Sequence, residues 1–140
     1  MFRNSKISVF GLLMTILMLG ACDTSDDNNP SPVPDTRDKF VGEWAVNNEV
    51  CGKGKYLATI SKDPSNSAQV LIHNFAFSNA GKPDTAVVAG SSIVVYQQTN
   101  SEGWQIEGNG LYSSIETIEW SYSLLISGTL ENCTCTYIKN

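Results

Sequence analysis

Arrangements of residues typical of catalytic sites are sparse in this chain of 140 residues. His73 is the single histidine, and the sequence has no Gly-x-Ser-x-Gly elbow, no His-x-x-x-His pair and no phosphate-binding glycine loop. Glu116 and Glu119 could in principle form the carboxylate pair of a glycosidase, but acids spaced along a strand usually face solvent. We therefore expect no enzymatic activity and no cofactor.

Aromatic residues offer a different kind of chemistry, the stacking of a sugar ring or the binding of an apolar ligand. Aromatic residues in strands lie in the core more often than on a binding surface, so each candidate is also a candidate core residue. The five candidates for a binding surface are Tyr96, Trp104, Tyr112, Trp120 and Tyr122.

The first 21 residues have the layout of a secretory signal, with Arg3 and Lys6 before an uncharged apolar run over residues 7–19. A helix of these thirteen residues would be about 20 Å long, too short for a hydrocarbon core of about 30 Å. The sequence Leu19-Gly20-Ala21-Cys22 that ends this stretch resembles the lipobox of bacterial lipoproteins. The resemblance implies that the signal peptide 1–21 is removed and that Cys22 is acylated with chains such as palmitate. The alternative is a plain signal peptide with Cys22 in a disulfide.

Residues 22–37 are predicted to form a lipidated cysteine followed by a disordered tether. Residues 23–37 contain no aromatic residue and one aliphatic residue, Val33, so they lack the apolar surface that would offset the entropy of ordering. Pro30, Pro32 and Pro34 favour extended polyproline geometry, which makes a semi-rigid spacer.

The acidic residues of this tether bear on location. Ser25-Asp26-Asp27 resembles the export signal of surface lipoproteins in Bacteroidetes, which implies an outer-membrane lipoprotein of the cell envelope exposed on the surface. The alternatives are the periplasmic face or the inner membrane, because Asp23 beside the lipidated cysteine resembles an inner-membrane retention mark.

Charge limits the possible partners of the mature chain. Without the signal peptide the chain keeps seven of its nine Lys and Arg residues and all fourteen acids, a net charge of −7 over 119 residues. This balance argues against nucleic acid and against electrostatic adhesion to anionic lipid. We expect contact with the membrane through the N-terminal acyl chains, since two or three chains anchor a protein stably.

From residue 38 onward, short alternating apolar segments are separated by turn residues, and no window of ten or more residues shows helical periodicity. Residues 38–140 are therefore predicted to form one all-β domain of about eight antiparallel strands, either a sandwich or an up-and-down meander barrel. Gly108 and Gly110 are expected to bend the sixth strand. The predicted strands cover residues 40–47, 56–62, 69–77, 85–89, 92–98, 104–111, 116–127 and 132–139.

Asp38-Lys-Phe-Val-Gly-Glu-Trp44 resembles the Gly-x-Trp opening of the first strand in lipocalins. The domain also resembles small lipocalin-like lipoproteins of gut Bacteroidetes, through an early Cys before Tyr56, an Ile-His-Asn-Phe strand and a late Cys before a Tyr-x-Lys end. The resemblance implies a lipocalin-like barrel in which Trp44 packs across the floor. The domain lacks the long helix that lipocalins carry before their last strand.

If Cys22 is acylated, three cysteines remain: Cys51, Cys133 and Cys135. Cys133 and Cys135 share one strand face about 7 Å apart, the far limit for a disulfide, so one of them should reach Cys51 and alternation leaves the partner open. The lipocalin-like resemblance implies the pairing of Cys51 with Cys133, with Cys135 as a free thiol. A metal site built on three cysteines needs a fourth donor, and His73 is the single histidine. The pattern of its strand indicates that His73 is a half-buried strand residue, so we expect no metal site.

Two functions follow from these patterns. The first is a non-catalytic, lipid-anchored binding module that holds a small apolar or glycan ligand in the barrel mouth. The second is a structural or accessory surface lipoprotein with a protein partner, its barrel filled by side chains. The bulk of the expected inward positions favours a filled core: Phe40, Trp44, Val46, Ile60, Ile72, Val95, Trp104, Ile106, Trp120 and Ile126.

Overall fold

The computed structural model describes residues 31–140, of which Val33–Asn140 form the packed unit. The expected signal peptide 1–21, the lipidation site Cys22 and the tether up to residue 30 lie outside the described residues, so those expectations stay predictions. Among residues 31–140, no helix is both long and apolar enough to span a bilayer.

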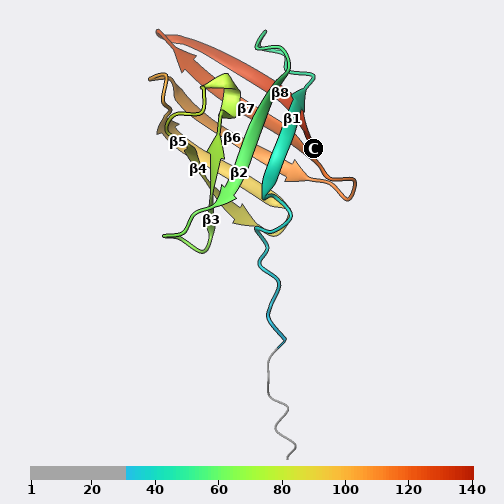
Figure 1. The fold of residues 1–140 in the computed structure, drawn as a ribbon. Coiled ribbons are helices and arrows are strands. Elements are labelled where there is room, and N and C mark those ends of the chain that lie inside the picture. Colours follow the sequence, from blue (N-terminus) through green and yellow to red (C-terminus); the bar gives the residue numbers. More distant parts are fainter. Residues whose placement is uncertain (1–30) are drawn as a thin grey trace, which may run out of the picture. The chain divides into compact units, whose positions relative to one another are not determined.

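Eight antiparallel strands close into a barrel in the order of the sequence, which confirms the predicted all-β up-and-down topology (Figure 1). Four residue pairs between the first and last strands, from Trp44 with Lys139 to Asn47 with Thr136, close the seam. The strands are β1 Gly42–Asn47, β2 Tyr56–Lys62, β3 Gln69–His73, β4 Asp84–Ala89, β5 Ser92–Thr99, β6 Gln105–Tyr112, β7 Thr117–Ile126 and β8 Thr129–Lys139.

The third strand is shorter than the sequence pattern predicts. It ends at His73, because Asn74 takes a left-handed conformation with φ 62°, and a short 3-10 helix η1, Phe75–Phe77, replaces the expected end of the strand. Asparagine tolerates this backbone region better than most residues. The turn redirects Phe75 into the barrel, where it is fully buried.

Bulky side chains fill the barrel from end to end. At the end where the chain enters the barrel, Trp44 is fully buried and donates its indole N–H to the Phe40 carbonyl oxygen at 2.8 Å. At the other end the Phe75 ring lies 4.7 Å from the Trp120 ring and 5.3 Å from the Tyr122 ring, centroid to centroid. The largest fully buried side chains are Trp44, Tyr137, Phe40, Phe75, Ile60, Ile72, Ile93, Ile106, Ile118, Leu124, Val46 and Val70.

The packed domain begins before residue 38, the expected boundary. Arg37 is 9% exposed, and one guanidinium nitrogen donates to the carbonyl oxygens of Asp63, Asn66 and Gln69 in the β2–β3 connection. The Asp35 carboxylate pairs with the same guanidinium at 2.7 Å, and this hydrogen bond lowers the pKa of Asp35. Residues 35–37, assigned to the tether from composition, therefore belong to the domain.

Candidate functional site

A groove crosses the outer face of β5 to β8. Two of its rows are fixed by strand register: Val94, Asn109, Ser121 and Thr134 lie side by side, and Glu107, Ser123 and Asn132 form the next row. All of these positions point away from the buried side chains of their strands. Together with Tyr96 and Gln97, most of them line a hollow of about 300 Å³. We call this surface the outer groove.

A bulge in β5 forms one wall of the outer groove. The register between β5 and β6 shifts between Val95 and Gln98, so two residues of β5, Tyr96 and Gln97, lie opposite the single residue Glu107. The bulge adds Gln97 to the exposed side of the strand. Tyr96 lies on the outward side by ordinary alternation, and 66% of its surface is exposed.

Glycines on the inner side of β6 allow close packing beneath the outer groove. A Cβ atom at Gly108 would lie 2.5 Å from Cβ of Tyr122, and one at Gly110 would lie 2.6 Å from a methyl group of Ile93. Because neither glycine has a side chain, β6 packs close against the interior at these positions. The small side chains of Ser121 and Ser123 then leave space above the neighbouring strand.

Glu107 gives the outer groove its negative charge, and its carboxylate accepts a hydrogen bond from the Ser123 hydroxyl at 3.3 Å. Beside the outer groove on the same face of β7, Glu119 accepts one from the Thr136 hydroxyl at 2.9 Å. The exposed amides of Asn109 and Asn132 add donors and acceptors that face solvent. This arrangement can bind a hydroxyl-rich ligand.

Of the five aromatic residues proposed from the sequence as a binding surface, only Tyr96 lies in the outer groove. Trp120 and Tyr122 point inward and are buried, which makes them core residues. Tyr112 is half-buried and packs edge-on against Phe40 and Trp44 at the entry end. Trp104 packs beside the core under the Lys53 ammonium, 4.8 Å from the ring centroid. The five side chains therefore do not form one site.

Sequence reasoning missed the polar members of the outer groove: Glu107, Asn109, Ser121, Ser123 and Asn132. The sequence signal that could have identified them is the alternation of polar and apolar residues, since each occupies a polar position between inward-facing residues of its strand. Alternation alone does not show which polar positions of different strands are neighbours. That information comes from the strand register.

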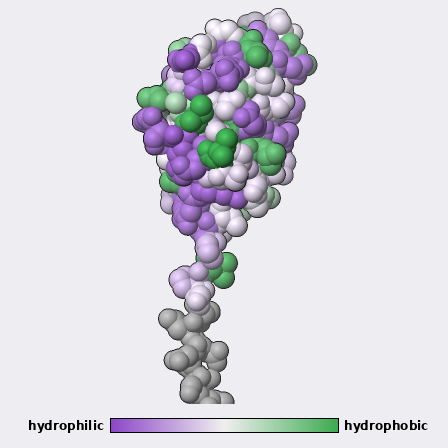
Figure 2. Space-filling view, turned by 90° about the vertical axis from the view of Figure 1, so that its right-hand side faces the viewer, coloured by the Kyte–Doolittle hydropathy of each residue, from purple (hydrophilic) through white to green (hydrophobic). Residues whose placement is uncertain are grey.

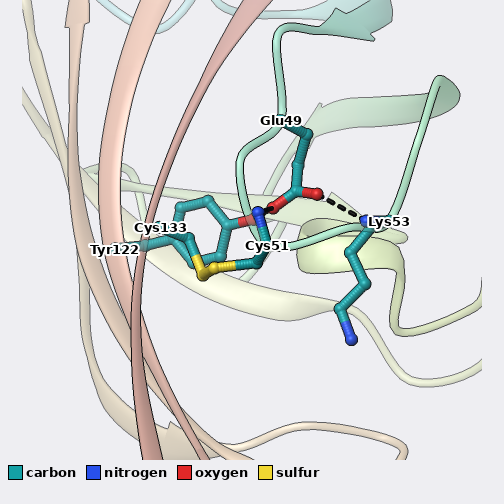
Figure 3. Close-up of a disulfide and its surroundings, with 5 residues drawn as sticks. All are labelled: Glu49, Cys51, Lys53, Tyr122 and Cys133. Atoms are coloured by element: carbon teal, nitrogen blue, oxygen red, sulfur yellow. Dashed lines mark hydrogen bonds between the residues drawn. A yellow bond between two sulfur atoms is a disulfide. The ribbon is translucent and has the colours of Figure 1, made fainter.

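A disulfide joins Cys51 to Cys133, with 5.5 Å between the Cα atoms, as the lipocalin-like resemblance implies (Figure 3). Glu49 organises the loop beside the disulfide. Its carboxylate accepts the Tyr122 hydroxyl at 2.9 Å and the backbone N–H groups of Cys51 and Lys53 at 2.8 and 2.6 Å. Figure 3 shows the Lys53 ammonium pointing away from this carboxylate, so Glu49 acts as a loop cap.

The thiol chemistry of this region is limited. Glu49, Cys51 and Cys133 are close enough together to hold a metal ion, but both sulfurs are used in the disulfide. Cys135 is a free, buried cysteine, and burial raises the pKa of its thiol to about 12. Such a thiol is a poor nucleophile and metal ligand at neutral pH.

The other candidate catalytic residues do not meet in one place. His73 is half-buried at the end of β3, opposite Thr59. Glu116 lies in the turn before β7, and Glu119 lies on the outer face of that strand. The only acid buried among residues 31–140 is Asp84, at the start of β4, and burial raises the pKa of its carboxyl group to about 6.

Comparisons with known proteins found no family model that matches this chain and no similar protein among those of curated function. The outer groove is therefore interpreted from its own residues.

Proposed function

We propose that the chain is a lipid-anchored, non-catalytic binding protein of the cell envelope that binds a glycan in the outer groove of a lipocalin-like barrel. The anchor is Cys22, preceded by the lipobox-like Leu19-Gly20-Ala21. The acidic tether that follows supports an outer-membrane, surface-exposed location.

The observation that carries this proposal is the contrast between the two faces of the sheet. Inside the barrel, Phe75 packs against Trp120 and Tyr122 in the space where a ligand was expected. On the outer face, hydroxyl, amide and carboxylate groups surround a hollow beside the exposed ring of Tyr96. The negative face of an aromatic ring attracts the polarised C–H groups of a pyranose, and the polar groups can bond its hydroxyls.

The test is binding of the full chain in detergent micelles to an oligosaccharide array. We expect Tyr96→Ala and Asn109→Ala each to weaken binding about tenfold, the effect of about 1.4 kcal/mol. Leu57→Ala is the matched control, because Leu57 is 50% exposed on β2, outside the outer groove. Absence of glycan binding, or unchanged binding by both groove variants, would overturn the proposal.

The anchor has a separate test. Cys22→Ser should abolish acylation, so the unprocessed precursor should accumulate, and intact mass spectrometry of the wild type should show acyl chains on a chain beginning at Cys22. A mature wild-type chain without acyl groups would contradict the anchor and leave the outer groove unaffected.

The second candidate function, an accessory lipoprotein with a protein partner, is favoured by an apolar row on another face. Leu57, Ala45 and Ile138 are direct neighbours across β2, β1 and β8, and Leu57 and Ile138 are exposed. Figure 2 shows hydrophobic side chains in separate spots among hydrophilic ones on the face it presents. Loss of a crosslinked partner in Leu57→Asp/Ile138→Asp, with no glycan binding by the wild type, would favour this candidate.

A further inference from the structure

The outer groove is the middle part of a longer trough. A hollow of about 490 Å³ continues it past Val94, Asn109 and Ser121 toward Leu111 and Glu119. A smaller hollow of about 70 Å³ extends it in the opposite direction toward Leu130. The three hollows share lining residues, so they form one continuous surface that follows the strands.

The register gives the length of the trough. Four rows of outward-facing residues cross β6 and β7, from Gln105 beside Leu125 to Leu111 beside Glu119. Successive rows are two residues apart, about 6.7 Å along a strand, so the four rows span about 20 Å. A single sugar would occupy only part of this length.

The charges of the trough restrict the ligand further. Within residues 31–140, the side chains that line the three hollows include the carboxylates of Glu107 and Glu119 and no Lys or Arg. Glu107 lies in the middle and Glu119 near one end. These carboxylates repel uronate or sulfate groups and can accept hydrogen bonds from hydroxyl or ammonium groups.

Both ends of the trough carry an exposed aliphatic side chain. Leu111 is 58% exposed at one end and Leu130 is 62% exposed at the other. Apolar contacts at two ends separated by polar rows suit a chain of linked rings with C–H faces. A peptide strand is a poorer fit, because the closed barrel offers no free strand edge for backbone pairing.

We propose that the trough takes an extended oligosaccharide lying along the strands, and that it selects neutral or amino-bearing sugars over anionic ones. This inference rests on the glycan-binding function proposed above. It adds the length and the charge of the ligand, and Glu107 as the residue that determines charge selectivity.

The experiment is an array of oligosaccharides one to six sugars long, in neutral, amino-bearing and uronate-containing sets, probed with the full chain in detergent micelles. We expect the best tetramers to bind at least tenfold more tightly than their monomers, and uronate tetramers to bind at least tenfold more weakly than neutral ones at low salt. Glu107→Gln should reduce the preference against uronates several-fold, as should 0.5 M salt. Glu43→Gln, on the exposed face of β1, should change neither value.

The outcomes separate the two proposals. If no glycan of any set binds, the proposed function fails, and this inference fails with it. If glycans bind in a Tyr96-dependent manner but monomers match tetramers, or uronates match neutral sugars, only the inference is overturned. Capture of a peptide or protein through the same residues would replace the glycan by another class of ligand.

Discussion

At the scale of single residues, Trp44 joins the first strand to the entry end of the core. Its ring is fully buried, lies edge-on to Tyr112 at 6.4 Å and donates to a buried carbonyl group. Trp44→Ala should lower the free energy of unfolding by about 3–5 kcal/mol, measured by urea denaturation. Leu57→Ala, at a half-exposed position on β2, should cost less than about 1 kcal/mol. Equal effects would contradict the role of Trp44 in the core.

Asp84 makes the stability depend on pH. Its pKa is raised from 3.8 to about 6 by burial, partly offset by the charge of Lys82, and one carboxylate oxygen is buried without a hydrogen-bond partner. Because the folded state favours the protonated form, stability should fall as pH rises from about 4 to about 6 and stay lower above that range. Asp84→Asn should be more stable than the wild type at pH 7, by at most about 3 kcal/mol, and the difference should vanish near pH 4.

Asp63→Asn is the control with the opposite sign. Hydrogen bonds from Ser65 lower the pKa of Asp63, so the stability it contributes is present above pH 4 and is lost as pH falls. Thermal unfolding followed from about pH 2 to about pH 8 covers the titration of both carboxyl groups. A stability difference for Asp84→Asn that does not change with pH would contradict the buried carboxylate.

Part of the outer groove could be predicted from the sequence. Alternation along β7 correctly makes Trp120 and Tyr122 inward-facing, and the same rule places Ser121 and Ser123 outside. Alternation also places Tyr96 outside, on the same side of β5 as Ser92 and Val94, but the exposure of the next residue, Gln97, depends on the bulge. The bulge depends on pairing with β6, which is a property of the folded sheet.

At the scale of elements, close packing of β6 shapes the outer groove. Gly108→Ala places a methyl group against the Tyr122 side chain and 3.0 Å from the Ser121 carbonyl oxygen, so β6 and β7 must move apart at this point. We expect a loss of about 1–3 kcal/mol in urea denaturation, together with weaker glycan binding. Asn109→Ala, one residue away on the outer face, should leave stability within about 0.5 kcal/mol. A Gly108→Ala variant with unchanged stability would contradict this packing.

The segment that enters the barrel is held by Arg37. Because its guanidinium is bound to Asp35 and to three carbonyl groups, trypsin should not cut after Arg37 in the native protein. Cleavage should begin instead after Lys55, which is exposed in the loop before β2. Asp35→Ala should make the bond after Arg37 cleavable, as mass spectrometry of the fragments would show. Early cleavage after Arg37 in the wild type would restore the tether boundary expected from composition.

The sequence pattern predicted most strands but not the path of the chain after β3. Apolar residues on both faces of the segment predict one strand over residues 69–77, whereas the chain leaves the sheet at Asn74. Four residues of the segment 74–79 have positive φ: Asn74, Ala76, Phe77 and Asn79. The packing of Phe75 against Trp120 stabilises this backbone, and that contact forms only when β3 and β7 are on opposite sides of one core.

At the scale of the whole molecule, closure depends on the pairing of β1 with β8 and on the disulfide beside it. Val50 donates to the Thr134 carbonyl oxygen at 3.2 Å, so the loop after β1 follows β8 as far as the bridge from Cys51 to Cys133. The disulfide therefore extends the seam beyond the last paired residues. The sequence predicted that Cys51 reaches the last strand, and strand geometry left both partners open.

The disulfide joins residues 82 positions apart, and a loop of this size restricts the unfolded chain strongly. In the chain-entropy model it contributes about 4–5 kcal/mol, so Cys51→Ala/Cys133→Ala should lose about that much in urea denaturation. Reductant should bring the wild type to the same stability and leave the variant unchanged. Cys135→Ala should cost about 1 kcal/mol and stay sensitive to reductant, because this thiol is buried and unbonded. Iodoacetamide should label Cys135 alone in the unfolded, non-reduced domain, and labelling of Cys51 or Cys133 there would contradict the covalent seam.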